Sequence, residues 1–515
     1  MFTWHRSTAR NDRKYEHPKI LPFETASLAK KIYTNSSAEW SRVEQKHLQD
    51  LFERMAHEVP AYVRFLKKNG ITRNLSKEYS SIPVMSKANY LRANKMTDLF
   101  WNGSMRVPQI LTSTSGSTGA PTYFARSHMV DDQSAFIHEL IFRSSSLHED
   151  KSTLVIVCFG MGVWIGGVIT YQAFEQMGRH GYPVSVITPG INKAEILKIL
   201  TDLAPHYEQI ILAGYPPFLK DVIDEAVDQG ISLRAYRVML LFAAEAFTDR
   251  FRKYVCEKIG IKNILTDAIN IYGTADIGTM AFETPISIFA RRLALENEEL
   301  SLKLFHGATK TPTLTQFVPT FVSFEEKDGE LFLSGDSAVP LMRYAIGDNG
   351  GVYSFEELSQ IFQSHGINLR RAARDAGIAA QMTELPFVYV YERIDLSTTL
   401  YGLQIYPETI KEVLLDERFN GFLTGKLTLI TKYDDEHNQY LEINLEHKPK
   451  VSTDESFSIA LLGEIVKNLR AKNSEFRELS DSLGERSAPK LVFWHYEDPL
   501  YFKPGIKQKW VVQPT

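Results

Sequence analysis

A stretch rich in hydroxyl side chains, LTSTSGSTGAPT (111–122), has the composition of a loop that binds an anion. It carries two glycines and no charge, and a proline lies near its end. Glycine lets the backbone approach phosphate oxygens closely, while Ser and Thr supply neutral hydrogen-bond donors. The stretch therefore predicts a phosphate-binding loop.

This loop differs from two common phosphate-binding motifs. A P-loop has Lys directly after its last glycine, and the dinucleotide fingerprint is G-x-G-x-x-G, whereas here Gly116 and Gly119 are followed by Ala120. A flexible Ser-rich surface linker is the alternative that the composition leaves open. The remainder of the chain must decide between them.

The elements after the loop indicate an α/β fold with a doubly wound sheet. Short apolar runs alternate with helical patterns, as expected for parallel strands buried on both faces. The runs are TLVIVC (153–158), VSVI (184–187), QIIL (209–212), RVMLLFA (237–243) and AINIY (268–272), with helices predicted over 192–203, 217–229 and 248–259. Because ligands bind beyond the carboxyl ends of such strands, the loop and the residues after the last two runs are expected to share one crevice.

The chain divides into a large domain over 1–394 and a small, mobile α+β domain over 395–515. The large domain is predicted to have a helical entry (1–110, with an irregular, partly ordered polar arm over 1–45), an α/β core (111–320) and a β-rich part (321–394). In the small domain, a helix opened by Pro407, a hairpin near 425–449, a helix over 456–471 and a strand over 489–496 are expected.

Composition excludes several classes of protein. The net charge of −4 gives no electrostatic reason to expect nucleic acid as a partner. Cys158 and Cys256 lie in apolar surroundings and are expected to be core thiols of a reducing compartment. No run approaches 18 apolar residues, so we expect a cytoplasmic protein without a membrane span.

Further motifs follow the loop in a fixed order, and together they resemble the acyl-adenylate-forming ligases, the AMP-binding superfamily. The similarity covers 48–512 and is greatest to the phenylacetate:CoA ligase branch, which commonly has Pro-Thr after the loop, here Pro121-Thr122. The motifs are AAEAF (243–247), IYGTADIG (271–278), MRYAIGD (342–348), ERIDLSTTLYGLQIYPETI (392–410) and FKPGIKQKWVV (502–512).

The resemblance assigns the phosphate groups of ATP to the loop. The β- and γ-phosphates would be held by Thr114, Ser115, Gly116, Ser117, Thr118 and Gly119, with Thr118 also counted as catalytic. Asp276 takes the position of a Glu that binds Mg²⁺, and hard oxygen ligands suit that ion. Ala275 replaces a Thr that contacts the α-phosphate, which puts the efficiency of adenylation in doubt. Turn caps are the alternative role for the hydroxyls.

The resemblance assigns the nucleoside to residues of three motifs. Tyr272, Gly273 and Thr274 would bind the adenine side, with the tyrosine ring stacked on the base; a core aromatic is the alternative. Ala244 and Glu245 would line the adenine pocket, unless Glu245 is a solvent-facing residue at a helix start. Asp348 would accept hydrogen bonds from both ribose hydroxyls, or else occupy a hairpin turn.

The resemblance assigns the hinge to the junction between the domains and the catalytic lysine to the C-terminal segment. Arg393 is a nucleotide-binding candidate and Asp395 a hinge for the small domain, although Glu392 replaces the usual Gly and a surface salt bridge is the alternative. Lys507 is the candidate catalytic lysine that bridges the substrate carboxylate and the α-phosphate. Lys503 and Lys509 are rivals, Trp510 stands where Arg is usual, and a basic surface tail is the alternative.

The acyl group is assigned to the segment CFGMGVWIGGV (158–168) and to GYPPFL (214–219). Phe159, Trp164, Gly166 and Tyr215 are the candidate walls, and plain core packing is their alternative role. Apolar walls favour an aromatic or medium-chain acid over an amino acid, whose ammonium group needs a carboxylate partner.

The resemblance implies an ATP- and Mg²⁺-dependent acid–thiol ligase. A carboxylate would react with ATP to give acyl-AMP and pyrophosphate, and CoA would then displace AMP. Transfer to a carrier protein or an amine stays open, as do a homodimer and a degenerate nucleotide-binding protein without ligase activity.

Overall fold

One mixed sheet forms the body of the protein. The computed structural model describes residues 22–71, 79–107, 109–113, 123–306, 312–391, 397–502 and 511. Among these residues, eleven strands pair in the order β10-β11-β12-β13-β9-β8-β7-β6-β5-β3-β4. The five predicted strands are confirmed as its parallel half: β3 (Thr153–Cys158), β4 (Val184–Ile187), β5 (Gln209–Gly214), β6 (Arg237–Ala243) and β7 (Ala268–Thr274).

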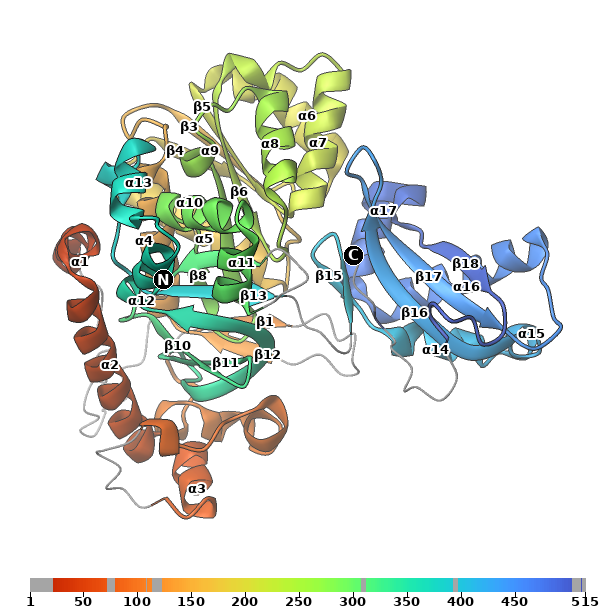
Figure 1. Cartoon of the computed structure of the whole chain (residues 1–515), viewed down its shortest axis with the longest axis horizontal. Helices are drawn as coiled ribbons and strands as arrows, with labels where there is room; N and C mark the ends of the chain where they lie inside the picture. Colours follow the sequence, from red (N-terminus) through yellow and green to blue (C-terminus); the bar gives the residue numbers. More distant parts are fainter. Residues whose placement is uncertain are drawn as a thin grey trace, which may run out of the picture.

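Helices cover both faces of this parallel half, which confirms the doubly wound arrangement. Leu154 and Ile156 of β3 pack in the core cluster that contains α6 (Lys193–Asp202), α7 (Pro216–Asp228) and α8 (Asp249–Ile259). Val155 and Val157 point to the opposite side and pack with α4 (His128–Ser144) and α5 (Ile165–Arg179). Alternate residues of one strand thus serve two layers (Figure 1).

The predicted β-rich part is a continuation of the same sheet. β8 (Gly278–Phe282) pairs antiparallel with β7 and leads into β9 (Thr313–Gln316), β13 (Phe387–Tyr391), β12 (Leu341–Tyr353), β11 (Glu330–Gly335) and β10 (Val322–Lys327). A separate core cluster lies under α10 (Pro285–Leu295), α11 (Glu298–Phe305), α12 (Phe355–Ser364) and α13 (Leu369–Asp375). A short α9 (Ile264–Asp267) precedes β7, and β1 (Ile110–Ser113) pairs with β2 (Tyr123–Arg126) apart from the sheet.

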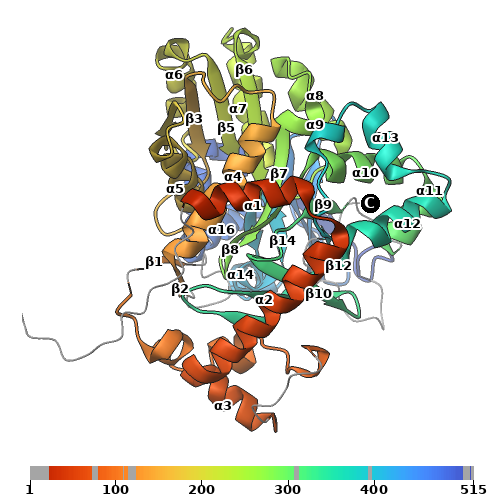
Figure 2. The ribbon, with the colours of Figure 1, turned by 90° about the vertical axis from the view of Figure 1, so that its left-hand side faces the viewer.

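The N-terminal region is more ordered than the sequence predicted. Within the predicted irregular arm (1–45), residues from 22 onward form α1 (Pro22–Thr34) and the first part of α2 (Ser37–Glu58), which α3 (Pro60–Lys68) follows (Figure 2). A capping box between Ser36 and Glu39 fixes the start of α2, and Trp40 is buried against the core. The prediction of an irregular arm was wrong there because the apolar residues that anchor these helices, among them Ile32 and Trp40, are dispersed in a polar sequence.

The second half of α2 forms an N-terminal cluster with strands far along the chain. Leu51, Phe52 and Met55 pack in one core with Leu331, Leu341 and Tyr344. Met85 extends this contact, since it bridges to Tyr344 in parallel register. The N-terminal cluster therefore joins the first and last parts of the large domain.

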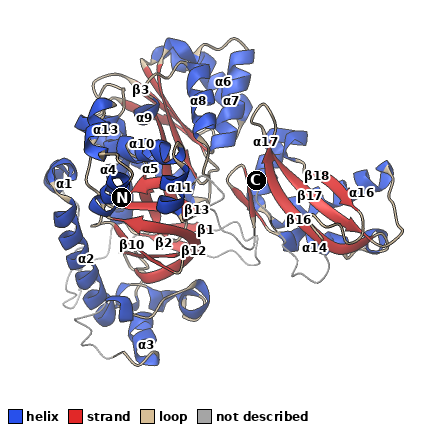
Figure 3. Ribbon diagram, viewed as in Figure 1, coloured by secondary structure: helices blue, strands red, loops and turns tan. Residues whose placement is uncertain are grey.

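The C-terminal part is a smaller α+β domain (Figures 1 and 3). Its sheet has the order β16-β17-β18, with an antiparallel hairpin and a parallel third strand. The predicted helix, hairpin, helix and strand are confirmed, whereas α17 and a small β14–β15 hairpin were not predicted. The elements are β14 (Thr398–Leu400), β15 (Leu403–Ile405), α14 (Pro407–Leu414), α15 (Glu417–Asn420), β16 (Leu423–Tyr433), β17 (Gln439–His447), α16 (Glu455–Lys472), α17 (Ser474–Leu483) and β18 (Lys490–Trp494).

The structure bears on two further predictions, one about the cysteines and one about membrane spans. Cys158 and Cys256 are buried free thiols, and burial raises the pKa of both, that of Cys256 to about 12. None of the described helices has the length and apolar character needed to cross a membrane.

Candidate active site

A cavity of about 360 Å³ lies where the carboxyl ends of the parallel strands meet the C-terminal domain. Every predicted site residue that falls within the described ranges lines this one cavity: Phe159, Trp164, Gly166, Tyr215, Ala244, Glu245, Tyr272, Gly273, Thr274, Asp276 and Asp348. The other candidates lie outside the described residues: Thr114, Ser115, Gly116, Ser117, Thr118, Gly119, Arg393, Asp395 and Lys507 with its rivals Lys503 and Lys509.

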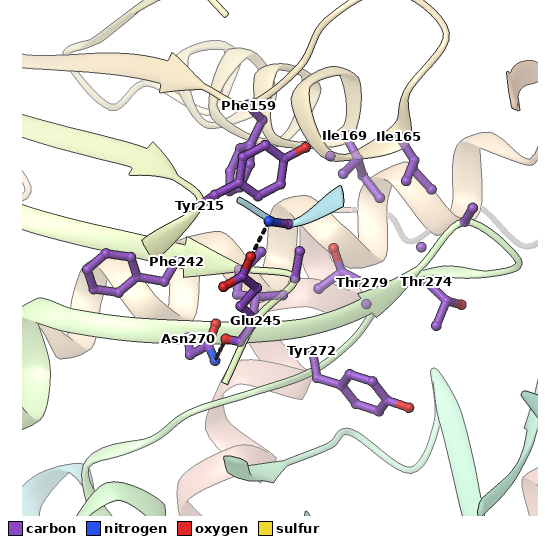
Figure 4. A pocket seen from close by; sticks show the side chains of 18 of the residues that line it. Phe159, Ile165, Ile169, Tyr215, Phe242, Glu245, Asn270, Tyr272, Thr274 and Thr279 are labelled. Atoms are coloured by element: carbon purple, nitrogen blue, oxygen red, sulfur yellow. Dashed lines mark hydrogen bonds between the residues drawn. The ribbon is translucent and has the colours of Figure 1, made fainter. Parts of the chain in front are cut away.

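The convergence follows from strand direction (Figure 4). Tyr215 follows β5, Ala244 and Glu245 follow β6, and Tyr272 lies near the end of β7. Parallel strands end at the same edge of a sheet, so residues just beyond them become neighbours. Ser113, the last residue of β1, also lines the cavity and pairs with Tyr123 of β2.

One corner of the cavity combines an aromatic ring with a carboxylate. The Tyr272 hydroxyl donates a hydrogen bond to Asp348 Oδ2 at 2.6 Å. The tyrosine ring packs nearly parallel to Phe324, with centroids 6.0 Å apart and planes at 27°. Tyr272 is half-buried, lines the cavity and also packs against a core cluster, so its ring belongs to both. The corner offers a stacking surface beside an acceptor suited to hydroxyl groups.

A second corner places a buried carboxylate beside a cation. Asp276 is 6% exposed, its Oδ1 accepts a hydrogen bond from the Tyr344 hydroxyl at 2.6 Å, and Lys87 Nζ lies 3.6 Å from the same oxygen. Sequence reasoning missed Lys87, which begins the short helical turn η2 (Lys87–Leu91) about 190 residues before Asp276 and carries no motif signal.

The donor set at Asp276 fits Mg²⁺ that arrives with ATP. The described residues contain no group of three His, Cys, Asp or Glu side chains that could hold a metal. Mg²⁺ commonly uses one or two carboxylates and completes its octahedron with substrate phosphates and water. A single buried carboxylate would therefore be sufficient for such an ion, and Lys87 would add positive charge beside it.

Ala244 adopts a backbone conformation that favours glycine, with φ of +74° at the exit of β6. An L-residue in this region costs roughly 1 kcal/mol, while glycine adopts it freely. We expect Ala244→Gly to raise the free energy of unfolding by about 0.5–1 kcal/mol, measured by chemical denaturation. Ala243→Gly, one residue earlier inside β6, is the matched control and should be destabilising; a loss of stability in both variants would contradict the assignment of strain.

Glu245 contacts the C-terminal domain. Its side chain is buried, so the alternative of a solvent-facing residue is wrong. Glu245 Oε1 accepts a hydrogen bond from the Gly402 backbone N–H (Figure 4). Oε2 accepts one from Gln439 Nε2 at 2.9 Å. The backbone carbonyl of Glu245 accepts a further bond from Asn270. Glu245 thus lines the cavity and fixes the β14–β15 hairpin against it.

Helix α7 provides a second contact between the domains. Buried Asp221 accepts hydrogen bonds from the Tyr401 hydroxyl at 3.0 Å and from Arg486 Nη2 at 2.6 Å. The neighbouring Lys220 donates to Asn438 Oδ1 at 2.7 Å. Burial raises the pKa of Asp221, and Arg486 opposes that shift. These polar contacts hold the C-terminal domain in the arrangement described.

Gly402 of the hairpin lies directly against the ring of Tyr215, one of the candidate acyl-binding residues. It has φ of +80°, and a Cβ at this position would lie 2.4 Å from Tyr215 Cδ1. The Tyr215 ring is itself packed edge-on against Phe159, with centroids 5.1 Å apart. Trp164 lies across the backbone of Gly160, where a Cβ would be 2.8 Å from the indole. Only glycine fits where the hairpin meets the Tyr215 ring.

Glu475, in the first turn of α17, lines the cavity from the C-terminal domain and gives a pH prediction. Burial, and then the charge of Glu478, raise the pKa of Glu475 to about 7. Between the ordinary pKa of a glutamate and pH 7, the Glu475 carboxyl is protonated in the folded state but ionised in the unfolded state. The free energy of unfolding should therefore fall as the pH rises through that range.

Glu475→Gln should therefore reduce the drop in thermal midpoint between pH 5 and pH 8. Part of the drop should persist, because burial also raises the pKa of Glu44 to about 7. Glu455→Gln, an exposed residue in the first turn of α16, is the control. Equal pH profiles for wild type and Glu475→Gln would contradict the raised pKa.

The fold is that of the adenylate-forming ligases. The chain is similar to a crystal structure of 2-hydroxyisobutyryl-CoA ligase in complex with 2-HIB-AMP and CoA in the thioesterification state, with a TM-score of 0.63 and 15% identity over 98% of this chain and 95% of that one. Two further structures of that ligase have TM-scores of 0.52: a postadenylation state (14% identity, 98% and 95% coverage) and an open conformation (15%, 98% and 97%). No protein-family model and no curated protein sequence matches the chain.

Proposed function

We propose that this protein is an AMP-forming acid–thiol ligase of the phenylacetate:CoA ligase type. Its first half-reaction joins a carboxylate oxygen to the α-phosphorus of ATP and releases pyrophosphate. In the second, the sulfur of CoA attacks the acyl carbon and AMP departs. The observation that carries the proposal is that the candidates for nucleotide and acyl binding within the described residues line one cavity.

The described residues divide the work in a way that suits this chemistry. Tyr272 and Asp348 would bind adenine and ribose. Asp276 would hold Mg²⁺, which offsets charge on the phosphates, and Lys87 would attract the same phosphates. The residues 114–119 and Lys507 keep their predicted phosphate and catalytic roles as part of this proposal, as do Arg393 in nucleotide binding and Asp395 as the hinge.

The acid is proposed to be aromatic or of medium length. Phe159, Trp164, Tyr215, Ile165 and Ile169 give the cavity apolar walls. CoA is the proposed acceptor, since the solved ligase of similar fold is described with an acyl-AMP and CoA. Product analysis with CoA, a carrier protein or an amine distinguishes these acceptors.

Acid-dependent exchange of labelled pyrophosphate into ATP tests the first half-reaction directly. Exchange with members of an acid panel, and none without acid, is the expected result. A chain that binds ATP in calorimetry but shows no exchange with any acid would instead be a nucleotide-binding protein without ligase activity. Ala275, which lines the cavity where Thr is usual, favours this second candidate.

A further inference from the structure

A buried histidine lines the wall of the cavity. His138 of α4 is 1% exposed and lines the cavity together with Ile169 and Thr170 of α5. Its Nδ1 lies 2.7 Å from the backbone oxygen of Ser134, one turn earlier in the helix. The ring packs edge-on against Phe174, with centroids 5.2 Å apart. Two contacts therefore fix the orientation of the imidazole.

The contact with Ser134 also fixes where the proton of the ring lies. A backbone carbonyl only accepts hydrogen bonds, so Nδ1 must be the protonated nitrogen. Burial lowers the pKa of His138 to about 4, which keeps the ring neutral. Nε2, at the far end of the ring from the helix backbone, is then a lone-pair acceptor.

This acceptor has no partner within the described part of the chain. Nε2 of His138 is buried, and no described group donates a hydrogen bond to it. The nearby Ser134 hydroxyl is paired with the Thr279 hydroxyl at 2.9 Å. A buried acceptor without a donor is costly, so a donor on a bound ligand would stabilise the complex.

We propose that His138 Nε2 accepts a hydrogen bond from a hydroxyl group on the acid, so that the protein selects a hydroxylated carboxylic acid over its counterpart without the hydroxyl. The inference rests on the proposed function and narrows its substrate class. A neutral imidazole offers no negative charge, and Ile169, Thr170 and Phe174 beside it offer none either, which disfavours an ammonium group.

Matched pairs of acids test the proposal on the wild-type protein. Pyrophosphate exchange is measured with phenylacetate against its 3- and 4-hydroxy forms, and with straight-chain acids of four to eight carbons against their terminally hydroxylated forms. In at least one pair, kcat/KM should be higher for the hydroxylated acid by roughly 10- to 100-fold. Equal or lower values for the hydroxylated acid in every pair would overturn the proposal.

His138→Phe keeps a ring of similar size and removes the acceptor. In this variant the ratio of kcat/KM for the preferred pair should fall close to one, while exchange with the acid that lacks the hydroxyl persists. His47→Phe is the matched control, because Nε2 of His47 is also buried without a described partner but His47 of α2 does not line the cavity. An unchanged ratio in His138→Phe would contradict the role of Nε2.

The outcomes separate this inference from the proposed function. If several acids support exchange but hydroxylated acids are not preferred, the role of His138 is contradicted and the ligase activity is still supported. No exchange with any acid removes both. The wild-type comparison decides the matter even where His138→Phe does not fold, which its thermal midpoint reports.

Discussion

Asp276→Asn should lower the rate of acid-dependent pyrophosphate exchange by roughly 10²-fold or more. The substitution keeps the size of the side chain but removes the charge that would hold Mg²⁺ against the phosphates of ATP. Asp276 is buried beside Lys87, so the charge is removed from a site with little access to solvent. The exchange assay at saturating ATP measures the effect.

Two variants show whether the loss comes from the charge. Tyr344→Phe removes the hydrogen bond to Asp276 Oδ1 but leaves the carboxylate, and it should cost far less than Asp276→Asn. Asp276→Glu restores a carboxylate of the type that stands in the motif that this chain resembles, and should recover most of the rate. A rate near wild type in Asp276→Asn would show that this residue does not hold the metal.

Gly402→Ala should slow the formation of the CoA thioester by about 10²-fold while leaving pyrophosphate exchange nearly unchanged. A methyl group at this position would collide with the Tyr215 ring, which Phe159 backs and which therefore cannot retreat easily. The β14–β15 hairpin would then lose its place beside Glu245 at the cavity. Single-turnover transfer from preformed acyl-AMP to CoA, measured beside exchange, separates the two half-reactions.

Gly425→Ala provides the matched control for this prediction. Gly425 has nearly the same backbone conformation, with φ of +83°, but a Cβ there would meet nothing within 4 Å. The control carries the backbone strain without the collision, and should leave both half-reactions nearly unchanged. Equal losses in exchange and transfer for Gly402→Ala would show that the hairpin does not act in the second half-reaction alone.

The parallel half of the fold was predictable because its strands are buried on both faces. Each is a short, continuous apolar run, and the helices between them begin at recognisable caps such as Asn192 and Thr248. The antiparallel strands β8 to β13 gave weaker signals, and nothing in their pattern indicated that they extend the same sheet. The first part of α2 was missed because Trp40 is its main apolar anchor there.

The candidate site likewise contains residues that could be predicted from the sequence and residues that could not. Residues just after apolar strands, such as Tyr272 and Glu245, could be placed from strand direction and motif order. Lys87 and His138 could not, because a lone basic residue in a turn or a helix has no periodic or motif signal and acquires meaning only from its neighbours in space. The contacts of Asp221 with Tyr401 and Arg486 were equally invisible, since they join segments 180 or more residues apart.

The N-terminal cluster has a consequence for how the protein is made. Tyr62 and Trp101 cover part of the apolar face of α2 early, but the part that packs on Leu331, Leu341 and Tyr344 stays uncovered until those residues have been synthesised. A ribosome adds about 5 to 20 residues per second, so the delay is on the order of 15 to 60 s. During that interval the growing chain exposes part of the apolar face of α2. Chaperones that bind exposed apolar segments are expected to bind the nascent protein there.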